Sequence, residues 1–252
     1  MPRHNGHHIV KVHPPQKKVI IIGATSGLGL EIARLYLKQN CMVGITGRRE
    51  EELLRLAQEY PGQVFWRRMD VQSEDCVGVF QDLIDEMDGL DMVIYSAGVG
   101  AQNPKLDPAI EMNTVQTNVA GFVRIVVHAY NYFKEQNSGH IVDISSFAGI
   151  RALRQSPAYS ATKRCQIHYM SCLAQKANSE NLFMVFTTIV PGFIRTRMLN
   201  YKYPLTTSLE KGSRLIFNAI ERKRRYTTVP GRWRWIEFIW RLIPNRIWEK
   251  IW

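Results

Sequence analysis

The feature that most constrains the fold is an apolar run followed by three closely spaced glycines and then by a helical pattern. Residues 19–22 are all β-branched, typical of a strand buried on both faces of a sheet, and Gly23, Gly27 and Gly29 follow. From Leu30 onward, apolar and charged residues alternate with the period of an amphipathic helix. Glycines let the backbone approach a ligand, and a helix N-terminus offers N–H groups to a phosphate. The stretch therefore predicts an anion site, with an ordinary tight turn as the alternative.

Strand-like and helical segments alternate along the rest of the chain. Strands are expected at 19–23, 42–46, 64–69, 92–95, 141–145, 182–190 and 226–229, and helices near 28–40, 50–60, 73–88, 109–136, 157–179 and 208–222. This alternation predicts an α/β single-domain Rossmann fold over residues 18–230, a doubly wound parallel sheet of about seven strands with helices on both faces. Ligands bind outside the carboxyl ends of strands in such sheets, so residues there are candidate site residues.

The start of the chain and its cysteines bear on the cellular setting. Residues 1–17 carry basic residues and prolines without an apolar stretch, which predicts a flexible leader rather than a signal peptide. His4, His7 and His8 could bind a metal, but a polar arm explains them more simply. The four cysteines have no CxxC spacing, and no run of about 18 apolar residues occurs. We therefore expect a cytoplasmic protein with reduced thiols, no metal site and no transmembrane helix.

Three strand ends carry residues suited to a dinucleotide. Gly47-Arg48-Arg49 stands where such domains usually place an acid for the ribose 2′-OH. A guanidinium pairs well with phosphate, which favours NADP(H), unless these arginines only begin a solvated helix. Asp70-Val71 would accept from the adenine amino group and pack on its ring, and Ser96-Ala97-Gly98 would let a cofactor lie across the strand end. Both could instead be plain strand-to-loop junctions.

A candidate catalytic group follows the fifth strand. Ser146 ends that strand, and Tyr159 and Lys163 lie at i and i+4 on one face of a helix that Pro157 helps to start. An ammonium near a phenol lowers the pKa of the phenol, and a nearby hydroxyl can orient a carbonyl oxygen. The group predicts general acid–base chemistry suited to carbonyl reduction, whereas the tyrosine–lysine pair alone is common on protein surfaces.

Together these motifs resemble the classical short-chain dehydrogenase/reductases from about residue 17 to residue 230. The matching segments are Gly23-x-x-x-Gly27-x-Gly29, Asp70-Val71, Ser96-Ala97-Gly98, Thr117-Asn118-Val119-Ala120-Gly121, Ile144-Ser145-Ser146, Tyr159-Ser160-Ala161-Thr162-Lys163 and Pro191-Gly192-Phe193-Ile194-Arg195-Thr196. Two departures stand out. Ile22 replaces a usual Thr, and Tyr95 replaces an Asn that normally helps tie the sheet together, which leaves the support of the fourth strand open.

The resemblance implies a role for each matching residue. Tyr159 would protonate the carbonyl oxygen, Ser146 would bind that oxygen, and Lys163 would hold the ribose hydroxyls and depress the tyrosine pKa. Asn118 would kink its helix and hold a water of a proton relay. The NADP(H) site would comprise Gly23, Thr25, Ser26, Gly27, Leu28, Gly29, Arg48, Arg49, Asp70, Val71, Ser96, Ala97, Gly98, Asn118, Tyr159, Lys163, Pro191, Gly192, Ile194 and Thr196. The family also pairs its two long helices in dimers or tetramers, so a homodimer or homotetramer is expected.

The expected substrate pocket is mostly apolar. The family's substrate loop would contain Met198, Leu199, Tyr201, Tyr203, Pro204 and Leu205, and Val99, Phe147, Ile150, Leu153 and Phe193 should face the pocket. This predicts a bulky hydrophobic, lipid- or steroid-like ketone or alcohol. Arg151 and Arg154 near the mouth could meet an anionic group of the substrate or simply be solvated.

Residues 231–252 form a tail that holds five of the six tryptophans. Helical spacing puts Arg234, Glu237 and Arg241 on one face, and Pro244 separates a second helical pattern. The opposite face of the first pattern holds Trp235, Ile236, Ile239, Trp240 and Ile243. The apolar face of the second pattern holds Ile247, Trp248, Ile251 and Trp252. Such segments are typical of peripheral membrane contact, and the alternative is packing on the substrate loop or a partner subunit. Nucleic acid is not expected, although residues 221–252, with nine basic and three acidic groups, carry +6 of the net +11.

Two classes of function fit these observations. The first is an NADP(H)-dependent oxidoreductase acting on a carbonyl or secondary alcohol. The second is a non-catalytic NADP-binding sensor or membrane-associated scaffold on the same fold. The complete set of Asn118, Ser146, Tyr159 and Lys163 favours the enzyme, because a protein without catalysis has no need of all four.

Overall fold

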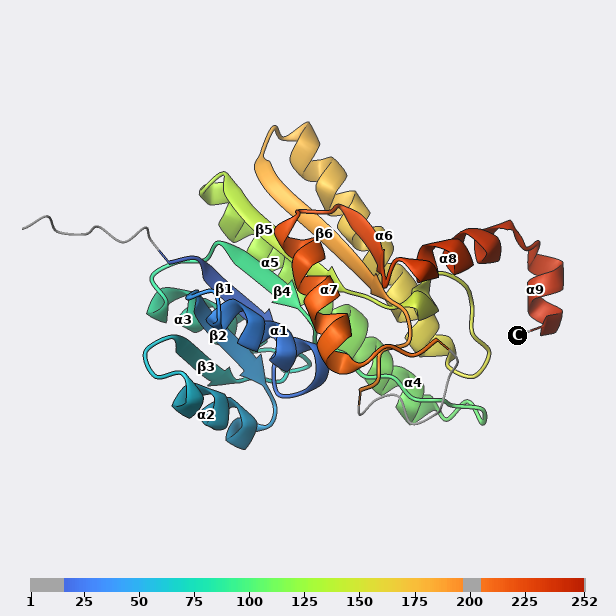
Figure 1. The fold of residues 1–252 in the computed structure, drawn as a ribbon, viewed down its shortest axis with the longest axis horizontal. Helices are drawn as coiled ribbons and strands as arrows, with labels where there is room; N and C mark the ends of the chain where they lie inside the picture. The colour runs from blue at the N-terminus through green and yellow to red at the C-terminus, as the bar shows by residue number, and fades with distance from the viewer. Residues whose placement is uncertain (1–15, 197–204, 252) are drawn as a thin grey trace, which may run out of the picture.

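A seven-stranded parallel sheet, in the order β3-β2-β1-β4-β5-β6-β7, forms the centre of the computed structural model, which describes residues 16–196 and 205–251 (Figure 1). The strands are β1 (Lys18–Ile22), β2 (Met42–Gly47), β3 (Val64–Arg68), β4 (Met92–Tyr95), β5 (Ser138–Ile144), β6 (Phe183–Pro191) and β7 (Tyr226–Val229). This confirms the predicted doubly wound sheet. The strand order reverses between β1 and β4, and ligands of such sheets bind at that point.

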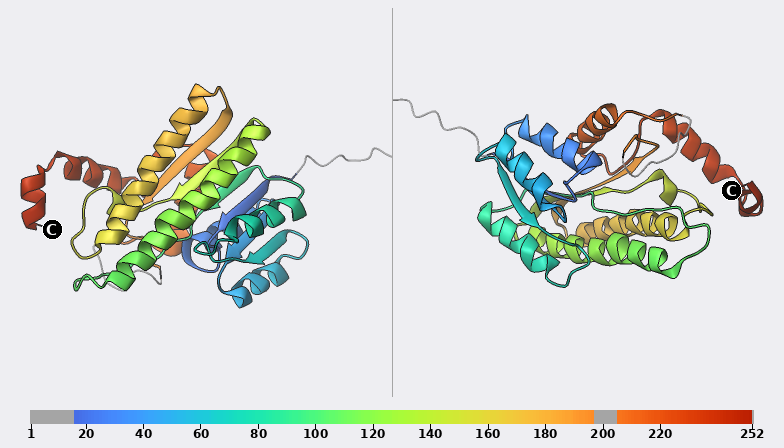
Figure 2. Two further views of the ribbon diagram at one scale, coloured as in Figure 1. Left: turned by 180° about the vertical axis from the view of Figure 1, so that it is seen from behind. Right: turned by 90° about the horizontal axis from the view of Figure 1, so that it is seen from below.

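Helices cover both faces of the sheet, as predicted (Figure 2). They are α1 (Gly27–Leu37), α2 (Glu50–Glu59), α3 (Cys76–Glu86), α4 (Pro108–Val115), α5 (Phe122–Glu135), α6 (Pro157–Ser179), α7 (Leu209–Glu221), α8 (Arg232–Leu242) and α9 (Asn245–Ile251). Side chains of α1, α2 and α7 build one core with the sheet, and side chains of α3, α5 and α6 build the other.

The apolar run of β1 is explained by these two cores. Ile20 and Ile22 point into the core under α3, α5 and α6, while Val19 and Ile21 point into the opposite core. All four side chains are completely buried, and each such burial contributes about 1.5–3 kcal/mol. An alternating polar pattern would therefore be incompatible with this central position in the sheet.

The helix predicted at 109–136 is divided by a π-helical turn, Gln116–Gly121, between α4 and α5. Asn118 lies in this turn, at the place where the family resemblance implied a kink. One-turn π-bulges are a recognised cause of helix kinks and occur often at functional sites.

Some sequence predictions fall outside the described residues. These are the leader up to residue 15, with its histidines, and the substrate loop from Met198 to Pro204, together with Trp252. Leu205 is described and is exposed. Lys17, at the end of the predicted leader, forms a 2.8 Å ion pair with Glu221 on α7.

Candidate functional site

In the glycine loop after β1, the backbone lies very close to neighbouring segments of the chain. Gly23 has a φ of +88°, and a Cβ there would lie 2.6 Å from the backbone of Ala97 at the end of β4. A Cβ on Gly29 would overlap the carbonyl oxygen of Gly23. Since neither overlap can be relieved by moving a flexible side chain, glycine is required at both positions. The loop leads directly into α1, whose first N–H groups are free to bind an anion.

A cleft of about 760 Å³ opens above this loop at the carboxyl edge of the sheet. All of the predicted site residues line it except Gly29 and Asn118. Gly29 packs beneath the loop against Gly23, and Asn118 lies completely buried behind the cleft. Sequence reasoning missed Gly100, Gln102, Ser145 and Ser156 as further lining residues.

The two arginines after β2 point to different parts of the cleft. Arg49 lies over the glycine loop, where its Nη2 donates to the hydroxyls of Thr25 at 2.8 Å and Ser26 at 2.7 Å. Arg48 lies 3.9 Å from the carboxylate of Asp70, and both side chains are about half-exposed. An anion bound between Arg49 and the two hydroxyls would meet one positive charge and several hydrogen-bond donors.

Ser146 and Tyr159 meet on the opposite side of the cleft. The 3₁₀ turn Phe147–Gly149 follows Ser146, whose Oγ accepts a hydrogen bond from the Ala148 amide at 3.1 Å. Burial raises the pKa of Tyr159, while its hydrogen bond to the Ser146 side chain works to lower that pKa. The pair can thus present two hydroxyl groups to one oxygen atom of a substrate.

Lys163 is buried one helical turn beyond Tyr159. Its Nζ lies 6.0 Å from the centre of the Tyr159 ring and donates to the carbonyl of Ile144 at 3.1 Å and to Gln166 Oε1 at 2.8 Å. Burial outweighs the influences that lower the pKa of Tyr159, and the ammonium of Lys163 is bound to those two oxygens.

Gln166 connects Lys163 to the π-helical turn. Its Nε2 donates to the main-chain carbonyl of Asn118 at 2.8 Å, and its side chain is completely buried. The Asn118 side chain in turn donates to the Val99 carbonyl and accepts from the Val99 amide, at 2.8 and 2.9 Å. A continuous chain of hydrogen bonds therefore joins the loop after β4, the π-helical turn and the lysine of α6.

Asp143 is a buried carboxylate behind the same lysine. It lies on β5 between Tyr95 of β4 and Thr188 of β6, and its carboxylate oxygens have no hydrogen-bond partner within the described residues. Burial raises the pKa of Asp143 to about 7, and the ammonium of Lys163 opposes that rise. Burial also lowers the pKa of Lys163, and Asp143 opposes that fall.

Tyr95 supports the fourth strand where the family's usual Asn is missing. Its completely buried phenol donates to the carbonyl of Thr117 in the π-helical turn at 3.0 Å. Its ring packs edge-on against Phe122 with centroids 5.1 Å apart. Support of the strand, left open by the sequence, thus comes from a tyrosine that spans from the sheet to the helix layer.

The substrate side of the cleft is largely apolar. Val99, Phe147, Leu153 and Phe193 line the cleft as predicted. Ile150 instead lies buried in a small core with Trp233 and Ile167, so its predicted position in the pocket is wrong. It faces inward because α8 covers this side of the domain.

The tail packs against the back of this apolar wall. Trp233 lies against Phe147 and Phe193, with ring centroids 4.6 and 5.0 Å apart, and Trp240 contacts Phe147 at 4.6 Å. Trp248 of α9 contacts Trp240 and donates through Nε1 to the Ala152 carbonyl at 2.7 Å. These three tryptophans therefore pack on the chain's own domain, at residues that neither the membrane expectation nor its alternative named.

Two charged residues near the tail lie against protein. Glu237 is buried, because Tyr226 and Thr228 of β7 donate to its carboxylate and draw it inward. Arg151 is neither free for substrate nor simply solvated. It donates to the Ile243 carbonyl at 2.7 Å and to Asn245 at 3.0 Å, and its guanidinium stacks on Trp248. Arg154 is exposed.

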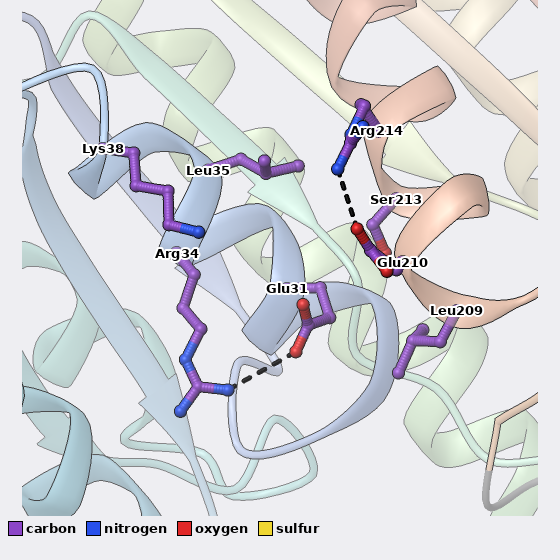
Figure 3. Close-up of a pocket in the computed structure, with 8 residues that line it drawn as sticks. All are labelled: Glu31, Arg34, Leu35, Lys38, Leu209, Glu210, Ser213 and Arg214. Atoms are coloured by element: carbon purple, nitrogen blue, oxygen red, sulfur yellow. Dashed lines mark hydrogen bonds and ion pairs between the residues drawn. The ribbon is translucent and has the colours of Figure 1, made fainter.

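A separate hollow lies between α1 and α7 (Figure 3). Four of its charged side chains pair with each other, Arg34 with Glu31 at 3.4 Å and Arg214 with Glu210 at 2.8 Å. It shares no residue with the main cleft. Within residues 16–196 and 205–251, no three His, Cys, Asp or Glu side chains gather as metal ligands. No helix in the same ranges combines the length and apolar character needed to cross a bilayer.

Comparisons with known proteins agree with this geometry. The sequence profile of a family described as short chain dehydrogenase matches residues 17–204. An uncharacterized oxidoreductase of Mycobacterium tuberculosis is 28% identical over 243 residues, covering 91% of this chain and 95% of the relative. Dehydrogenase/reductase SDR family member 7B of Bos taurus is 30% identical over 195 residues, covering 71% and 58%.

Two solved structures share the fold. ElxO with NADP bound superposes with a TM-score of 0.76 at 20% identity, covering 85% of this chain and 97% of that one. An actinorhodin polyketide ketoreductase with NADPH superposes with a TM-score of 0.75 at 21% identity, covering 86% and 96%.

Proposed function

Because this chain belongs to the short-chain dehydrogenase family of oxidoreductases, we propose that it reduces a carbonyl group of a hydrophobic substrate with NADPH, or oxidises the corresponding alcohol with NADP⁺. The observation that carries the proposal is the convergence of Ser146, Tyr159 and Lys163 on one cleft with the glycine loop. The alternative, an NADP-binding sensor or scaffold, explains the loop but gives no reason for the paired hydroxyls.

The chain's own residues fit the dinucleotide. The tight loop at Gly23 and Gly29 and the free amides of α1 suit a diphosphate, and Arg49 with Thr25 and Ser26 suits a 2′-phosphate. Two solved neighbours, ElxO and the actinorhodin polyketide ketoreductase, hold NADP and NADPH, which supports the same cofactor here. The other predicted cofactor residues from Asp70 to Thr196, apart from the buried Asn118, line the rest of the cleft.

The proposed chemistry divides between cofactor and protein. When bound, NADPH supplies the hydride that reaches the carbonyl carbon. Tyr159 donates its phenolic proton to the carbonyl oxygen, and Ser146 holds that oxygen by a hydrogen bond. Lys163 lies one helical turn beyond Tyr159 as a positive charge, which favours the phenolate that forms when Tyr159 gives up its proton.

The apolar wall formed by Val99, Phe147, Leu153 and Phe193 supports a hydrophobic, lipid- or steroid-like substrate. A cytoplasmic location and a homodimer or homotetramer belong to the same proposal. They rest on the family resemblance and on α4, α5 and α6, the long helices that the family uses for assembly.

The test is NADPH oxidation by the full chain against long-chain 3-keto lipids, steroids and small aldehydes. Turnover on the bulky ketones should fall by roughly 10²–10⁴ in Tyr159→Phe. The matched control Tyr60→Phe, at the end of α2 and outside the cleft, should keep wild-type turnover. NADPH binding without Tyr159-dependent turnover on any panel member would favour the sensor.

A further inference from the structure

One face of the tail stays apolar and open after the tail has packed on its own domain. Trp235, Phe238, Ile239 and Leu242 recur at i, i+3, i+4 and i+7 along α8, and their side chains are 74, 57, 57 and 65% exposed. Ile247 and Ile251 continue this pattern on α9, one turn apart and half-exposed. We call these six residues the outer face. Single exposed apolar side chains are ordinary, but a continuous helical stripe of them marks an interaction surface.

The outer face lies opposite the contacts that anchor the tail. Trp233, Trp240 and Trp248 point inward, and Glu237 fastens α8 to β7 through Tyr226. Figures 1 and 2 show α8 and α9 projecting from the end of the domain. The inner contacts therefore hold the outer face in a fixed position on the surface.

The charge around the outer face favours one kind of partner. Arg234, Arg246 and Lys250 are exposed and form no ion pair within the described residues. Of the two acidic residues in the tail, Glu237 is buried and paired with Arg241, so only Glu249 offsets this charge at the surface. A second copy docking through the same face would bring these like charges together. An anionic bilayer would accept both the apolar stripe and the basic residues.

We propose that the outer face of α8 and α9 binds the surface of anionic phospholipid membranes. The helices lie in the plane of the interface, with the apolar side chains among the acyl chains and the basic side chains at the phosphates. A consequence, which rests on the proposed function, concerns Phe147 and Phe193. These two cleft residues pack on the inner side of the same helix, so membrane contact brings the substrate side of the cleft close to lipid.

The test is co-sedimentation of the full chain, without substrate, with vesicles of phosphatidylcholine alone or mixed with phosphatidylserine. Wild type should bind the mixed vesicles, and added salt should weaken binding because it screens the basic residues. Phe238→Gln combined with Leu242→Gln should reduce the partition coefficient roughly tenfold or more. Arg246→Glu combined with Lys250→Glu should abolish the preference for phosphatidylserine.

The matched control is Phe183→Gln, which removes an even more exposed apolar side chain at the start of β6, outside the tail. It should bind as wild type does, and circular dichroism should show all variants folded. Failure of wild type to bind mixed vesicles, or equal binding by the Phe238→Gln, Leu242→Gln variant, would overturn the proposal. The proposal would also be overturned if light scattering showed a dimer of wild type and a monomer of the Phe238→Gln, Leu242→Gln variant. A second copy of the chain would then occupy the outer face. Since co-sedimentation, circular dichroism and light scattering do not depend on turnover, these outcomes are independent of the proposed reductase activity.

Discussion

The ammonium of Lys163 donates a hydrogen bond to the side-chain carbonyl of Gln166 at 2.8 Å, three residues further along α6. The other end of the same amide donates to the main-chain carbonyl of Asn118. Gln166 therefore joins the lysine to the main chain of Asn118, the residue to which the family resemblance gave a water of a proton relay. An amide at this place fixes both neighbours but transfers protons less readily than water, so we assign Gln166 the role of a positioning residue.

Gln166→Leu should lower kcat roughly tenfold and shift the pH profile of reduction to lower pH. The lost acceptor stabilises the protonated form of Lys163, so its removal lowers the pKa of that lysine. The orphaned carbonyl of Asn118 should also cost about 1–3 kcal/mol of stability. Gln136→Leu, which removes two side-chain bonds to backbone far from the cleft, is the control. A less stable Gln166→Leu enzyme with an unmoved pH profile would show that the residue serves the fold alone.

Asp143→Asn should change how stability depends on pH. The folded-state pKa of Asp143 is raised to about 7, above its ordinary value, so between roughly pH 4 and 7 the folded form holds a proton that the unfolded chain lacks. Wild-type stability should therefore fall as pH rises through that window, and the variant should lack this fall. Relative to wild type, the variant should gain roughly 1–3 kcal/mol between pH 5 and pH 7.

Urea unfolding of wild type and Asp143→Asn at the two pH values measures this gain. Asp82→Asn, an exposed carboxylate on α3, should follow wild type at both pH values. Parallel pH dependence of wild type and Asp143→Asn would contradict the assignment of a proton to Asp143 near neutral pH.

Sequence patterns predicted the sheet and the cleft because both depend on local signals. The buried run of β1, the glycine spacing and the residues at strand ends are short stretches whose meaning does not depend on distant parts of the chain. Gln166 was missed because its partners, Lys163 and Asn118, come together only when α6 packs on the π-helical turn. A polar residue three positions after Lys163, on the same helical face, was the available signal.

The tail shows a second limit of structure prediction from the sequence. Helical periodicity separated apolar and charged faces of residues 231–243 but could not tell which face meets the domain. That choice is made by Tyr226 and Thr228 of β7, which offer hydroxyl donors to Glu237. The inward face is therefore defined partly by a charged residue. Trp235 and Ile239 are exposed, although the sequence placed them on one face with Trp240, which packs inward.

Arg49→Gln should raise the KM for NADPH roughly 10–100-fold and leave the KM for NADH nearly unchanged. Charge-assisted hydrogen bonds contribute about 1.5–3 kcal/mol, and only NADPH carries the 2′-phosphate. Arg55→Gln, an exposed arginine on the same side of the domain in α2, controls for the loss of a positive charge. Equal effects on both coenzymes would mean that Arg49 acts by holding Thr25 and Ser26 in place rather than by binding phosphate.

Glu237→Ala should loosen α8 from the sheet. The buried carboxylate accepts from Tyr226 at 2.7 Å and pairs with Arg241 at 2.7 Å, so its removal leaves donors without acceptors and costs about 2–4 kcal/mol. Glu249→Ala, on the exposed side of α9, should cost almost nothing. Denaturant unfolding gives the cost, and limited proteolysis near Gly231 reports whether the tail has detached. Unchanged stability in Glu237→Ala, with the tail still protected, would mean that the packing of Trp233 and Trp240 on Phe147 is sufficient to hold α8.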